Sequence, residues 1–307
     1  MPDPSPATRN PRGEAYPLVG AFGLFVLAVH GALGNGLVSL NSQFGVQALM
    51  AAIPQIWPYL VFAAALLGSR RWARDLGAPA ALLAMVRALA SFPRYVFLGW
   101  ATAQMQGASA SQGAWRVLRH SLATLGAYAA LCAVTFYVLT RPELIQKCQS
   151  ERKQPGWTDG LAFAALLLVS CQLFTASASL SEALYRVQSL PSLQDLQAGG
   201  WHSLGDLQRG ALTAVAMSAL GLAALVGLWR RRGWGWTALL AQSLILLYLT
   251  VQGSFGKAQA AVDIALKKFP AVVLPLGLEA FCRNLPELAA LGVVLWALAR
   301  ARRQFSA

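Results

Sequence analysis

The chain has 307 residues, of which 56% are hydrophobic and only 12% are charged, and its mean hydropathy is +0.50. Soluble proteins carry about 25% charged residues, and disordered chains have low hydrophobicity, so both classes are excluded. Lys and Arg (25) outnumber Asp and Glu (12), giving a formal net charge of +13. This much apolar sequence argues against a nucleic-acid partner. We therefore expect an all-α, polytopic integral membrane protein whose basic residues lie mainly on cytoplasmic loops.

The N-terminal segment 1–16 contains several prolines and no apolar run, which predicts a disordered tail. The apolar stretch at 17–40 is long enough to span a bilayer, so it is interpreted as a transmembrane helix rather than as a secretory signal. At the other end, 300–307 is predicted to be a basic tail directly after an apolar helix. The transmembrane domain is therefore expected to cover 17–299.

Six segments have the roughly 20 mostly apolar residues that a span needs. They are 17–40, 45–68, 121–140, 160–180, 210–229 and 235–253. Two further stretches are ambiguous, because 76–104 contains arginines and prolines and 270–299 contains three prolines, two glutamates and an arginine. Each either crosses the membrane, re-enters it or lies at its surface. If both cross, the bundle has about eight transmembrane helices.

Charge distribution favours the eight-helix arrangement with both termini in the cytoplasm. Most basic residues then fall on inner segments, as the positive-inside rule requires. A seven-helix alternative would place the run Arg230, Arg231 and Arg232 outside, which the rule disfavours. Turns that combine arginine and tryptophan are common in bacterial membrane proteins, so the bacterial inner membrane is the expected location.

Two arginine- and tryptophan-rich turns, at 66–77 and 227–236, resemble each other, and the expected outer loops at 106–115 and 252–261 share a faint pattern. These similarities allow a duplication with four-helix halves at 17–140 and 160–299, although such turns are also a general solution for a cytoplasmic hairpin. The longest polar connection, 181–209, is expected to form two short amphipathic helices on the outer face. Loops of this length often bind partners.

The clearest candidate site is the series Glu279, Arg283 and Glu287, spaced i, i+4, i+8, in which Arg283 could pair with either carboxylate. Ionisable groups inside a bilayer often mark ion or substrate paths, and Pro286 would interrupt the helix, as at transporter sites. The alternative is structural. The charges would then lie at the outer interface, with Pro286 and Glu287 beginning the last helix in the ordinary way.

Arg87 and Arg94 are the second candidate pair, because their separation places them on one face of a helix. One hypothesis pairs that face with the acidic series of the last helix, since an unpaired arginine is costly in a membrane. In the other, both side chains extend to the interface or the helix lies flat on the membrane.

His30 lies in the first predicted helix beside several glycines, which favours an interhelical hydrogen bond and leaves proton transfer as an alternative. The four cysteines have no metal-ligand spacing, and no nucleotide, hydrolase or metalloprotease motif is present, so neither a cofactor nor a metal is predicted. Pro54 and Pro58 are expected to kink the second helix.

Three function classes remain. The favoured one is a non-enzymatic membrane subunit that scaffolds or anchors a larger complex, with membrane lipids and protein partners around it. The second is a small transporter or channel with its site at the interrupted last helix. The third is a membrane-embedded enzyme acting on lipid-linked substrates.

Overall fold

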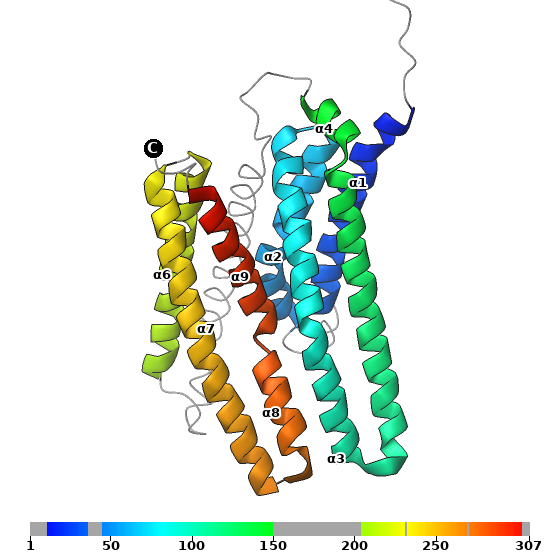
Figure 1. The fold of residues 1–307 in the computed structure, drawn as a ribbon, viewed down its shortest axis with the longest axis vertical. Coiled ribbons are helices and arrows are strands. Elements are labelled where there is room, and N and C mark those ends of the chain that lie inside the picture. Colours follow the sequence, from blue (N-terminus) through cyan, green and yellow to red (C-terminus); the bar gives the residue numbers. More distant parts are fainter. Residues whose placement is uncertain (1–10, 36–44, 150–203, 231, 269, 303–307) are drawn as a thin grey trace, which may run out of the picture.

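The computed structural model describes residues 11–35, 45–149, 204–230, 232–268 and 270–302, and within these ranges all regular structure is helical. The helices lie side by side in an elongated bundle (Figure 1). Their order is α1 (Pro11–Asn35), α2 (Gly45–Leu67), α3 (Arg71–Leu139), α4 (Pro142–Gln149), α6 (Leu204–Trp229), α7 (Gly233–Lys268), the short 3-10 helix η2 (Pro270–Val272), α8 (Val273–Cys282) and α9 (Leu285–Ala301). The all-α prediction is confirmed for this part of the chain. The predicted span at 160–180 and residues 181–203 of the expected connection 181–209 lie outside it, whereas 204–209 belong to the start of α6.

Helix α3 is a hairpin of two antiparallel arms. Gly99 in the first arm lies against Leu118 in the second, because a Cβ added to Gly99 would be only 2.7 Å from Leu118 Cδ2. Nearer the other end, Gly77 lies in the same way beside Leu139. The chain reverses at the end of the bundle opposite the C-terminus (Figure 1). The segment 106–115 connects the two arms, as expected, but it is helical rather than a loop.

Four helical segments among the described residues are long and apolar enough to cross a membrane: Arg71–Met105, Leu118–Leu139, Gly233–Gln252 and Pro270–Ala301. Both ambiguous stretches of the sequence lie within this set. Large apolar side chains are exposed on most helices, for example Phe22 (65%) and Leu212 (70%). A soluble monomer rarely exposes so many, so the protein is membrane-embedded.

Several arginine-containing segments lie together at one end of the bundle. The α2–α3 turn, the start of α4, the α6–α7 turn and the end of α9 all lie at the upper end in Figure 1. There, the Trp236 Nε1 donates a hydrogen bond to the Leu298 carbonyl, 3.2 Å away, joining the α6–α7 turn to α9. Arg71 pairs with buried Asp75 at 3.3 Å, and Arg74 contacts the same carboxylate. We call this the basic end.

Several helix bounds differ from the predicted ones. Helix α1 begins at Pro11 rather than at 17, so part of the expected disordered tail is helical. Helix α7 continues to Lys268, past the predicted limit at 253, and the expected outer loop at 252–261 is therefore wrong. The last span is interrupted, as Pro286 predicts, because α8 ends at Cys282. In a continuous helix the ring of Pro286 would clash with the Cys282 carbonyl.

At the basic end, α6 and α7 approach each other very closely at two glycines. A Cβ added to Gly235 would be 2.4 Å from the Gly227 carbonyl carbon and 2.5 Å from the Leu228 nitrogen. Because these are backbone atoms, a side chain at Gly235 cannot be accommodated by a rotamer change. Only two glycines facing each other allow the two helices to approach this closely.

Candidate functional site

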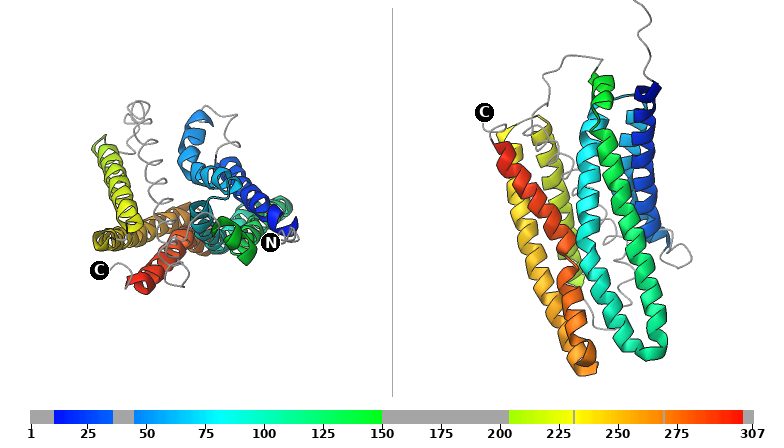
Figure 2. Two further views of the ribbon diagram at one scale, coloured as in Figure 1. Left: turned by 90° about the horizontal axis from the view of Figure 1, so that it is seen from above. Right: turned by 45° about the vertical axis from the view of Figure 1, so that its right-hand side comes forward.

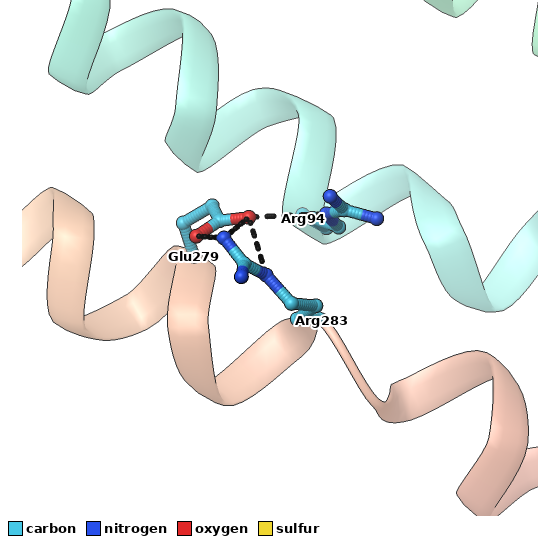
Figure 3. A network of polar contacts seen from close by, with 3 residues as sticks. All are labelled: Arg94, Glu279 and Arg283. Carbon is cyan, nitrogen blue, oxygen red and sulfur yellow. Dashed lines mark hydrogen bonds and ion pairs between the residues drawn. The ribbon is translucent and has the colours of Figure 1, made fainter. Parts of the chain in front are cut away.

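The bundle brings Arg94, Glu279 and Arg283 together (Figure 3). The Arg94 Nε donates a hydrogen bond to Glu279 Oε1 over 3.0 Å. Arg283 binds the same carboxylate from one turn further along: its Nη2 lies 3.1 Å from Oε2 and 3.2 Å from Oε1, and its Nε lies 3.3 Å from Oε1. The carboxylate therefore accepts hydrogen bonds from both arginines at once. We call these three residues the Arg-Glu-Arg cluster.

Burial within the Arg-Glu-Arg cluster is uneven. The Glu279 side chain is 4% exposed, whereas Arg94 is 37% and Arg283 is 45% exposed. A buried carboxylate is tolerated only when it is paired and hydrogen-bonded, and both conditions are met here. With two guanidinium groups and one carboxylate, the cluster keeps one net positive charge on its exposed side.

Two elements place these side chains. Glu279 and Arg283 are four residues apart at the end of α8, where the Arg283 backbone N–H still donates to the Glu279 carbonyl at 2.9 Å. Arg94 comes from the first arm of α3, which packs along α8 and α9. The sequence allowed Arg283 to pair with either Glu279 or Glu287, and in the structure it pairs with Glu279. Glu287 is exposed in the first turn of α9, where its charge suits a helix N-terminus.

The distance of the cluster from the basic end fixes its depth. Arg94 lies about 35 Å along the helix from Arg71, at a rise of about 1.5 Å per residue. Glu279 lies about 33 Å from Ala301 on the same basis. The hydrocarbon core of a bilayer is about 30 Å thick. If the basic end lies at one membrane surface, the cluster therefore lies at the headgroup level of the opposite surface, which favours the interfacial interpretation over a mid-membrane site.

Arg87 does not join the acidic series. Its charge is near the hydroxyls of Tyr59 and Tyr128, and no ion pair links it to an acidic side chain of the described residues. Its Nε is buried and has no hydrogen-bond partner among them. The predicted pairing between the two helix faces thus holds for Arg94 and is wrong for Arg87.

His30 lies beside the same tyrosines. Its ring stacks on Tyr128 with centroids 4.1 Å apart and an interplanar angle of 17°. This stacking joins α1 to the second arm of α3. Among the described residues it replaces the interhelical hydrogen bond that was expected for His30.

Sequence reasoning missed the tyrosines and one buried amide. Gln242 in α7 is fully buried, and its Nε2 donates to the Met217 carbonyl at 3.3 Å, which fastens α7 to α6. Its Oε1 has no partner within the described residues. An amide in the middle of the apolar stretch 235–253 was a usable signal, because polar side chains inside spans usually contact another helix. Tyr59 and Tyr128 gave no such signal, since aromatic residues are common in apolar helices.

Comparison with known proteins gives no relative from which a function could be inferred. No family model, no curated protein and no solved structure matches this chain.

Proposed function

We propose that this chain is a non-enzymatic integral membrane subunit that anchors a larger complex, with about eight transmembrane helices and both termini in the cytoplasm of a bacterial cell. The transmembrane domain at 17–299, and its possible four-helix halves at 17–140 and 160–299, belong to the same proposal. The support comes from the end of the bundle opposite the basic end.

Two helical hairpins are longer than a bilayer is thick. Helix α7 has 36 residues and is therefore about 54 Å long, but its apolar span covers only Gly233–Gln252. The first arm of α3, Arg71–Met105, has 35 residues and a similar length. The far ends of α3, α7 and α8 extend together beyond α1 and α2 (Figure 2, right). With the basic end at one surface, these ends project from the other.

The projecting hairpin of α7 and α8 exposes large apolar side chains, and this observation carries the proposal. Leu266 on α7 and Leu274 on α8 are 59% and 62% exposed. The two helices touch at Gly277, where an added Cβ would be 3.3 Å from Val262 Cγ2. Apolar side chains exposed outside the hydrocarbon mark a protein interaction surface.

The proposal is tested by purifying the full chain from its native membrane in a mild detergent. We expect stoichiometric co-purification of a partner, and we expect the double substitution Leu266→Ser and Leu274→Ser to abolish it. The matched control is Leu244→Ser with Leu249→Ser, two exposed apolar residues within the apolar span of α7 that should leave the complex intact. A monodisperse solitary chain, or loss of the partner in the control as well, would contradict the proposal.

A transporter is the second candidate, supported by the interruption between α8 and α9 directly beside buried Glu279. Broken helices of this kind hold substrates and ions in transporters. Reconstituted vesicles that show substrate-dependent flux, abolished by Glu279→Gln in a variant that still folds, would favour this function over anchoring.

A further inference from the structure

The Arg-Glu-Arg cluster has more hydrogen-bond donors than Glu279 uses. Arg94 contacts the carboxylate through Nε, so both of its Nη groups are left, and they point away from Glu279 (Figure 3). Arg283 uses Nε and Nη2 and leaves Nη1. On the described residues no hydrogen-bond acceptor is recorded for these three nitrogens. They are partly solvent-accessible, because both arginines are more than a third exposed.

Guanidinium groups held in this way suit a phosphate. The planar fork of arginine matches phosphate oxygens, and charge-assisted hydrogen bonds of this type are among the strongest in proteins. Glu279 fixes both guanidinium groups in place before any ligand arrives, so less side-chain entropy is lost on binding. Because the cluster retains a net positive charge, it attracts an anionic phosphate group. A phosphate ligand that also carries a positively charged group is attracted less strongly.

The surroundings point to the phosphate of a lipid. The cluster lies at headgroup level by its distance from the basic end, where lipid phosphates are concentrated. Large apolar side chains lie between it and the basic end: Leu89, five residues before Arg94 on α3, is 52% exposed, and Phe281, two residues after Glu279 on α8, is 54% exposed. These side chains offer an apolar surface for acyl chains beside a positively charged surface for the headgroup.

We propose that Arg94 and Arg283 bind the phosphate of an anionic phospholipid in the leaflet opposite the basic end, with Glu279 positioning both guanidinium groups. This site does not depend on the anchoring function. Free inorganic phosphate has the same recognition chemistry, so the experiment includes it as a separate arm.

The test uses the purified full chain and native mass spectrometry with three probes: phosphatidylglycerol, phosphatidylcholine and inorganic phosphate. We expect the wild-type chain to retain phosphatidylglycerol with roughly tenfold preference over phosphatidylcholine, and to show no competition from millimolar inorganic phosphate. The double variant Arg94→Gln with Arg283→Gln should lose that preference. The control Arg119→Gln removes an exposed arginine from the second arm of α3 and should keep it.

The double variant Arg94→Lys with Arg283→Lys guards against misfolding, because it keeps both charges next to Glu279. It should retain an intermediate preference, since lysine holds the charge but loses the fork. Equal retention of the two lipids by the wild-type chain would overturn the proposal. Unchanged preference in the glutamine double variant, or displacement of the lipid by inorganic phosphate, would also overturn it.

Discussion

The ion pair between Arg94 and Glu279 is expected to couple α3 energetically to α8. The perturbation is a double-mutant cycle in which Arg94→Gln and Glu279→Gln are made singly and together. Each substitution keeps a polar side chain of similar length, so the cycle reports the pair interaction rather than a loss of packing. Arg94 and Glu279 come from elements far apart in the sequence, so their coupling measures how the bundle is held together.

The magnitude follows from the geometry. Unit charges 3.0 Å apart attract by about 5 kcal/mol at an effective dielectric constant of about 20. Arg94 is 37% exposed, so solvent screening reduces this attraction, and polar pairs between membrane helices reach at most about 1.7 kcal/mol. We therefore expect a coupling free energy of about 1–2 kcal/mol. It should increase in an Arg283→Gln background, where Glu279 has no second guanidinium partner.

The coupling is measured by reversible unfolding of the purified chain in mixed micelles, with the free energy of unfolding of all four proteins compared. The control cycle combines Arg94→Gln with Glu287→Gln, because Glu287 is exposed in α9. Its coupling should stay within about 0.5 kcal/mol, as for independent sites. A coupling for Arg94 and Glu279 no larger than the control value, in both backgrounds, would refute the reasoning.

Two further predictions concern packing and orientation. Gly235→Ala should destabilise the chain by about 1–3 kcal/mol, because the new Cβ meets the backbone of α6. The control Gly292→Ala, whose added Cβ has nothing within 4 Å, should leave the thermal unfolding midpoint unchanged. Equal midpoints for the two variants would contradict the close α6–α7 contact. For the orientation, single cysteines replace Thr140 or Gln259, both exposed, in a background without native cysteines. A membrane-impermeant maleimide should label the two positions from opposite sides of the membrane. Labelling of both from the same side would contradict the orientation.

Much of the helical layout could be predicted from apolar length alone. The second helix was predicted at 45–68 and is observed as Gly45–Leu67. The limits of α7 could not be found in this way, because hydropathy reports where a chain leaves the hydrocarbon and not where its helix ends. Beyond Gly253 the segment is less apolar but rich in Ala and Lys, which propagate a helix in water as well.

The candidate site was predicted in part. Charges in apolar segments had to find partners, which is why Arg94 and Glu279 could be paired from sequence. Arg87 shares a helix face with Arg94 but lies about 10 Å closer to the basic end along the helix axis. At that level its neighbours are Tyr59 of α2 and Tyr128 of the second arm of α3. Which helix lies beside a given face at a given depth depends on how the two arms of α3 pack against the other helices, and apolar length does not determine that packing.

The central claim, that the projecting α7–α8 hairpin binds a protein partner, is tested most directly by site-specific photo-crosslinking in intact cells. A photoreactive residue is placed at Leu266, at Leu274 or, as the control, at Leu244, which is 51% exposed within the apolar span of α7. The account predicts one protein adduct of the same mass from Leu266 and Leu274 and none of that mass from Leu244. Adducts with lipid alone at all three positions would contradict it.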